Sequence, residues 1–96
     1  MSDTIDPNFS VRTDAHIDLA NAQLKGAPGP LVAASMSFAT ARFNTWLCAN
    51  MYGTPEEMKR MRETAITQLS EHYNNMLQDN FDAAIANFKD FVGTQN

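Results

Sequence analysis

A histidine between two aspartates is the first arrangement in the sequence whose residue types suggest chemistry. Asp14, His16 and Asp18 are spaced two residues apart, and carboxylates and imidazoles are common metal ligands. At about 100° per residue, however, Asp14 and Asp18 share one side of a helix, whereas His16 points to the other. His72 stands beside Glu71 with the same mismatch, and no two histidines have the four-residue spacing of a helical zinc site. We therefore expect no metal site and no cofactor.

The groups that can serve as nucleophile or general base are equally isolated. Cys48 is the single cysteine, which excludes an internal disulfide and a cysteine-based zinc site. It lies among small residues, where a thiol is usually buried and unreactive. Glu56 and Glu57 form the one carboxylate pair, and helix capping accounts for them. We expect no catalytic residue, and therefore a protein that is not an enzyme.

Nucleic acid and membrane are poor partners for this chain. Seven basic residues stand against eleven acidic ones, a net charge of −4, which disfavours phosphate backbones and anionic lipid. The only basic cluster, Lys59, Arg60 and Arg62, has three glutamates interspersed and spreads over more than a third of a helix circumference. The longest uncharged run, 26–41, contains glycine and proline and is too short for a membrane span.

A small set of polar residues lies on the helix expected over 31–52, whose other residues are apolar or small on all sides. Arg42 and Asn44 belong to this helix, and Asn21 on the preceding helix is placed to face them. A buried guanidinium needs a partner, because an unpaired buried charge is costly. An ion pair to a neighbouring helix is the structural interpretation. The functional interpretation is a ligand-binding pocket in which Asn21, Arg42 and Asn44 hold a small anion or an acidic side chain.

The length and composition predict a single helical domain over residues 1–96. A chain of 96 residues is too short for two independent cores, and 44% hydrophobic with 19% charged residues is ordinary for a globular protein. We expect flexible ends at 1–6 and 93–96. The acidic N-terminus lacks the apolar stretch of a secretory signal, and the single cysteine suits a reducing compartment, so we expect a cytoplasmic protein.

Glycine and proline divide the chain into helices. Asp6 before Pro7 predicts a capped helix start. Gly53, Thr54 and Pro55 predict a left-handed residue, an N-cap and a first helical position, with Glu57 closing a capping box. Nothing reads as a strand. The expected fold is all-α, with three antiparallel helices over residues 7–25, 31–52 and 55–92.

The pattern of apolar residues predicts where the second helix lies and whether the third is straight. The second helix is expected at the centre of the fold, with Phe43 and Trp46 in the core. The third has two apolar stripes about a quarter turn apart, one over Met58, Ala65, Leu69, Tyr73 and Met76, the other over Leu77, Phe81, Ala84, Phe88 and Val92. A long or kinked helix is favoured. The alternative is a four-helix bundle with a break near Asp79.

Three stretches of the chain resemble a known family. They are 14–21, which reads DAHIDLAN, 35–44, which reads SMSFATARFN, and 85–88, which reads IANF. Together they resemble a family of short uncharacterised bacterial proteins, domain of unknown function 3144. The resemblance implies a small cytoplasmic helical protein of bacterial origin. It implies no activity, substrate or catalytic residue.

The length of the third helix predicts a homodimer. The first two helices can cover about 33 Å of it, which leaves roughly 24 Å at its C-terminal end. The uncovered end is apolar, and a two-fold partner is the commonest way to cover such a surface. We therefore expect a non-catalytic homodimeric interaction or structural protein. The alternative is a small-molecule or anion-binding protein with Arg42 as its anchor. The predicted dimer interface comprises Phe81, Ile85, Phe88, Phe91 and Val92.

Overall fold

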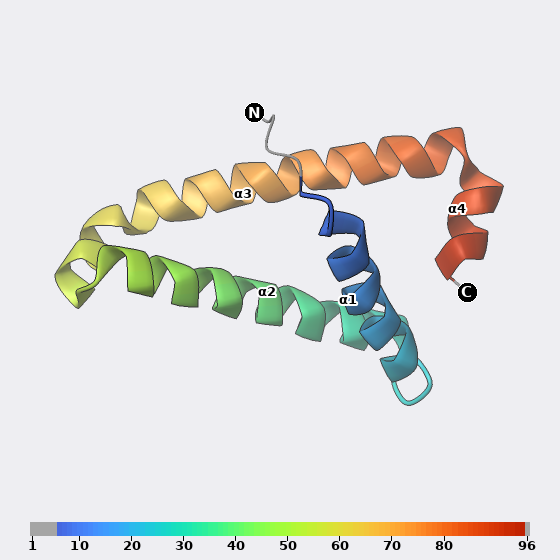
Figure 1. Cartoon of the computed structure of the whole chain (residues 1–96), viewed down its shortest axis with the longest axis horizontal. Helices are drawn as coiled ribbons and strands as arrows, with labels where there is room; N and C mark the ends of the chain where they lie inside the picture. The colour runs from blue at the N-terminus through green and yellow to red at the C-terminus, as the bar shows by residue number, and fades with distance from the viewer. Residues whose placement is uncertain (1–5, 96) are drawn as a thin grey trace. The chain divides into compact units, whose positions relative to one another are not determined.

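The computed structural model describes residues 6–95 and confirms an all-α fold. Within this range no strand is present. The chain divides into two compact units, Met1–Ala39 and Thr40–Asn96, with their boundary inside the second helix. The helices are α1 (Phe9–Gln23), α2 (Gly29–Tyr52), α3 (Pro55–Ala86) and α4 (Phe88–Gln95), shown in Figure 1.

The first unit contains α1, the turn after it and the start of α2. Asn8, rather than the predicted Asp6, occupies the N-cap of α1, and its side chain makes no capping bond. Asp6 lies before this N-cap and bonds to it. Its Oδ1 accepts the Asn8 N–H at 3.0 Å, and its carboxylate also pairs with Arg12. Ala20 on α1 and Val32 on α2 are the buried apolar residues described in the chain, at 7% and 5% exposure.

The turn between α2 and α3 is the one that the sequence predicts. Gly53 adopts a φ of +83°, a left-handed conformation that glycine takes without a steric penalty, and its N–H binds the carbonyl of Ala49 at 3.0 Å. Thr54 is the N-cap of α3, with its hydroxyl oxygen accepting the Glu57 N–H at 3.1 Å, and Pro55 begins the helix. Local backbone preferences are sufficient to specify this turn.

The third helix is interrupted at Asn87, beyond the alternative break predicted near Asp79. It continues through Asp79, so the expected break near that residue is wrong, and Asn80 donates its side-chain N–H to the carbonyl of Met76 at 2.8 Å. α3 ends at Ala86 and α4 begins at Phe88, so the long third helix of the prediction is interrupted at Asn87 instead of running unbroken over 55–92. Asn87 takes a non-helical φ of −133° and ψ of 55°. Its carbonyl then accepts the Phe91 N–H at 2.9 Å as α4 begins.

The expectation of a core centred on α2 is wrong for the described chain. Phe43 and Trp46 are 61% and 58% exposed, and they stack on each other with ring centroids 5.9 Å apart. Val32 is the one buried residue of α2. Helical spacing placed Phe43 and Trp46 on one side of α2, but both remain largely exposed.

The chain ends fall mostly outside the described residues. The predicted flexible segments are 1–6 and 93–96, of which residues 1–5 and 96 are not described. Residues 93–95 belong to α4.

Candidate interaction surface

The polar residues predicted as an anion site differ in their exposure. Arg42 is exposed, whereas Asn44 is half-buried. Two residues apart on a helix, their side chains point about 160° away from each other. Asn21 is half-buried on α1, in the first unit. The premise of a buried guanidinium at Arg42 is therefore wrong, and with it the strongest reason to expect an anion there.

Three ion pairs join charged residues that are near neighbours in the sequence. Arg12 pairs with Asp6, Arg60 with Glu57 at 2.8 Å, and Arg62 with the adjacent Glu63. All six side chains are exposed, and exposed pairs contribute little to stability. They organise the helix surfaces locally and create no charged cleft.

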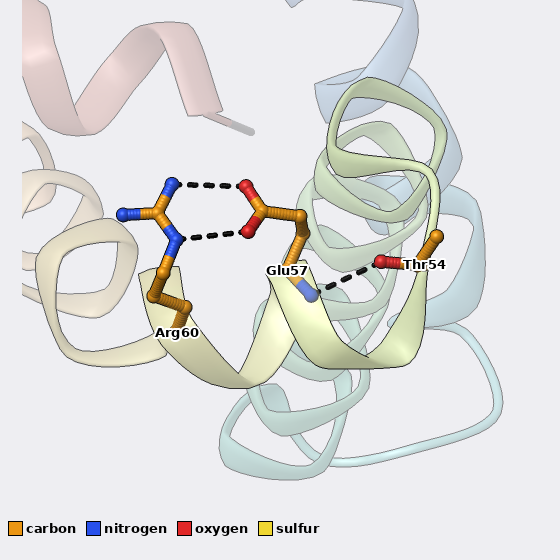
Figure 2. Close-up of polar contacts among 3 residues, drawn as sticks. All are labelled: Thr54, Glu57 and Arg60. Carbon is orange, nitrogen blue, oxygen red and sulfur yellow. Dashed lines mark hydrogen bonds and ion pairs between the residues drawn. The ribbon is translucent and has the colours of Figure 1, made fainter.

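The pair at the start of α3 has one measurable electrostatic consequence. Arg60 donates from Nε and Nη2 to the two carboxylate oxygens of Glu57, as Figure 2 shows. This hydrogen bonding lowers the pKa of the Glu57 carboxyl from its ordinary value. Because the carboxylate binds Arg60, the capping box predicted at Thr54 is only half formed: Thr54 accepts from Glu57, without the reciprocal bond.

A hollow in the first unit lacks charged side chains that could hold a charged ligand. It has a volume of about 400 Å³ and opens between the end of α1 and the start of α2. Ser35, one of its two polar side chains, already donates its hydroxyl to the carbonyl of Val32 at 2.9 Å. The hollow is lined by Ala22, Gln23, Gly26, Ala27, Leu31, Val32 and Ser35.

The predicted dimer residues are all exposed, and they lie toward the C-terminal end of the described chain. Ile85 on α3 is 74% exposed and Phe88 on α4 is 67% exposed. The break at Asn87 separates them, so they lie on two different helices rather than on one straight stripe. We call this set the C-terminal apolar surface: Phe81, Ile85, Phe88, Phe91 and Val92, all exposed.

A second apolar stripe runs along the middle of α3. Ile66, Leu69, Tyr73 and Met76 follow one another at spacings of three, four and three residues, which is the pattern of a helix that packs lengthwise against another. All four are exposed, Tyr73 at 54%. We call them the central stripe. Leu69, Tyr73 and Met76 were recognised from the sequence as one apolar side, but Ile66 was not, and the spacing was the signal that identifies it.

Neither a metal-binding cluster nor a membrane-spanning helix is found among the described residues. Among residues 6–95, no group of three histidine, cysteine, aspartate or glutamate side chains gathers as a metal site would require. In the same range, every helix is too short or too polar to cross a lipid bilayer.

Comparison with known proteins places the chain in a family. The family described as Protein of unknown function (DUF3144) matches residues 9–85, which cover α1, α2 and almost all of α3 and leave α4 outside. The chain belongs to this family, and the resemblance seen in its sequence is confirmed. No curated protein and no solved structure matches the chain significantly.

Proposed function

We propose that this member of the DUF3144 family is a small, non-catalytic helical protein that acts as a homodimer. The observation that carries the proposal is the exposure of the C-terminal apolar surface, where Ile85 and Phe88 leave two-thirds or more of their area open. Monomeric soluble proteins rarely expose contiguous apolar patches of more than a few hundred Å². Exposed aromatic and branched side chains together at one end of a chain are typical of an interaction site.

The area of the surface supports association with a protein. An aromatic side chain presents about 150–250 Å², so five apolar residues that are about two-fifths to three-quarters exposed offer on the order of 500 Å². A standard interface buries about 800 Å² on each partner. The C-terminal apolar surface is thus large enough to be the centre of an interface, although it does not make a standard one alone.

A second copy of the chain is the partner that we favour. A two-fold axis brings identical apolar surfaces together, and two-fold dimers are the commonest soluble oligomers. The net charge of −4 supports a protein partner rather than nucleic acid or an anionic membrane. With its single cysteine half-buried, the chain suits the reducing cytoplasm of a bacterium, where we place its function.

Sedimentation equilibrium tests the proposal directly. We expect a mass twice that of the 10.7 kDa chain at micromolar concentration. Replacing Phe88 with glutamate buries an unpaired charge at the interface, and we expect it to shift the protein to monomer. Gln68→Glu adds the same charge on the exposed polar side of α3 and is the matched control. A wild-type mass of one chain refutes the homodimer.

A further inference from the structure

Within the proposed homodimer, we infer that association tightens as ionic strength rises, because pairing brings an acidic end of the chain against its own copy. This inference rests on the proposed function and adds the condition that regulates the dimer. The occupant of the C-terminal apolar surface is still the second copy. Two features support it: the charges that accompany the apolar residues, and the symmetry of the pairing.

Asp82 is the carboxylate that borders the C-terminal apolar surface on α3. At about 100° per residue, it lies about 60° around the helix from Ile85 and one turn before it. Both residues are on the side of α3 away from the central stripe. Asp79 precedes Asp82 by one turn, and both aspartates are exposed. An exposed carboxylate next to Ile85 lies at the edge of any interface that covers this apolar side chain.

The fourth helix adds one cation and one carboxylate to the same end of the chain. Lys89 and Asp90 follow Phe88 directly, and both are exposed. Residues 78–95 therefore carry three negative charges and one positive charge, a net charge of −2. Half of the chain's net charge of −4 thus accompanies the surface proposed for pairing. We call the three carboxylates the acidic margin: Asp79, Asp82 and Asp90.

No described ion pair neutralises the acidic margin. The ion pairs within residues 6–95 join residues before 64, and none includes one of these three carboxylates. The last of their cations, Arg62, lies about 30 Å along α3 from Asp82. Lys89 is the only cation of residues 78–95. The local net charge is therefore not compensated within the described part of the chain.

Two-fold symmetry turns this local charge into repulsion between the copies. In a two-fold dimer the same patch lies on both sides of the interface. A net charge of −2 thus faces a net charge of −2 in every register that buries the C-terminal apolar surface. Like charges across an interface oppose association. Burial of the apolar side chains drives dimerisation, and the acidic margin limits it.

The salt concentration sets how strongly the two copies repel each other. Between about 20 mM and about 500 mM sodium chloride, the Debye length falls from roughly 20 Å to roughly 4 Å. Exposed charges about 12–15 Å apart across an interface therefore interact at the lower salt concentration and are screened at the higher one. In a water-like dielectric, two net charges of −2 at that separation change the dissociation constant by about threefold between the two conditions.

Sedimentation equilibrium at these two salt concentrations tests the inference. We expect the wild-type dissociation constant to be about threefold lower at the higher salt concentration. Asp82→Asn keeps the size of the side chain and halves the local net charge of each copy. We expect this variant to dimerise about twofold more tightly than the wild type at the lower salt concentration, and its dissociation constant to change less than about 1.5-fold between the two conditions.

A second variant separates the local charge from the charge of the whole chain. Glu56→Gln changes the net charge by the same amount, but Glu56 lies about 40 Å along α3 from Asp82, beyond the Debye length at either salt concentration. Any general effect of salt on apolar association is common to the wild type and both variants. We therefore expect Glu56→Gln to dimerise as the wild type does.

The outcomes separate this inference from the homodimer itself. A monomer at both salt concentrations refutes both. A dimer whose dissociation constant stays constant or rises with salt overturns the inference and leaves the homodimer standing, and a rise means that Lys89 pairs with a carboxylate of the second copy. Equal effects of Asp82→Asn and Glu56→Gln also overturn the inference, because they trace the repulsion to the net charge of the whole chain.

Discussion

Glu57 and Arg60 form a two-point ion pair one turn into α3. Glu57 Oε1 accepts from Arg60 Nε at 2.8 Å, and Oε2 accepts from Nη2 at 2.9 Å (Figure 2). The hydrogen bond from Arg60 is the main reason why the pKa of the Glu57 carboxyl lies below its ordinary value. A lowered pKa means that folding favours the ionised carboxylate. The contribution of the ion pair to stability is therefore present above the pKa that the Glu57 carboxyl has in the unfolded chain. It is lost as pH falls through the lower pKa that this carboxyl has in the folded chain.

The first prediction is that Glu57→Gln removes a small acid-sensitive part of the stability. The urea midpoint of the wild type should fall more steeply than that of the variant as pH is lowered from 6 to 3. Glu71→Gln, on the same helix, controls for the loss of one carboxylate. Because the pair is exposed, raising the salt concentration should shrink the difference. Parallel pH profiles for wild type and Glu57→Gln would contradict the assigned role of the pair.

The second prediction concerns the cap at Thr54. Its hydroxyl oxygen accepts the Glu57 N–H, and removing such a cap costs about 1 kcal/mol of stability. Thr54→Ala should lower the free energy of unfolding by about that amount and leave the oligomeric state unchanged. Thr67→Ala, in the interior of α3, should be neutral or slightly stabilising because alanine has the higher helix propensity. A change of oligomeric state in Thr54→Ala would instead place the turn in an interface.

The third prediction concerns the stacked rings of Phe43 and Trp46. A buried phenylalanine costs about 3–5 kcal/mol when it is truncated to alanine, but these rings are exposed. We expect Phe43→Ala to cost well below that range in the monomer. A double-mutant cycle with Trp46→Ala should give a coupling of about 0.5–1.5 kcal/mol, as for other aromatic pairs. If Phe43→Ala instead lowers the free energy of unfolding by about 3–5 kcal/mol at concentrations where the chain is monomeric, another part of the chain covers α2.

The fourth prediction tests Arg42 as an anion anchor. Because its guanidinium is exposed, water competes with any bound anion, and we expect no saturable binding of inorganic phosphate at submillimolar concentrations. Nuclear magnetic resonance titration of the wild type and of Arg42→Gln should give the same small, linear shifts. Saturable binding that Arg42→Gln abolishes would restore the small-molecule alternative.

The local features of this protein follow from short stretches of sequence. The turn at Gly53, Thr54 and Pro55 was predicted residue by residue, because each conformation depends on the residue itself and on neighbours within one helical turn. The all-α fold follows in the same way from helical spacing and helix stops. The family resemblance was also visible in the sequence, and it matches residues 9–85.

Two local choices and one property of the tertiary structure were not determined by the sequence. Glu57 has two possible partners within reach, the Thr54 N–H and Arg60, and the structure shows that the charged hydrogen bonds prevail. The break of α3 at Asn87 rather than Asp79 reflects a choice between two short polar residues that both tolerate non-helical backbone. The exposure of Phe43 and Trp46 differs most from expectation. Helical spacing identifies which residues share a face, but burial depends on which other surface meets that face, and that is a property of the tertiary structure.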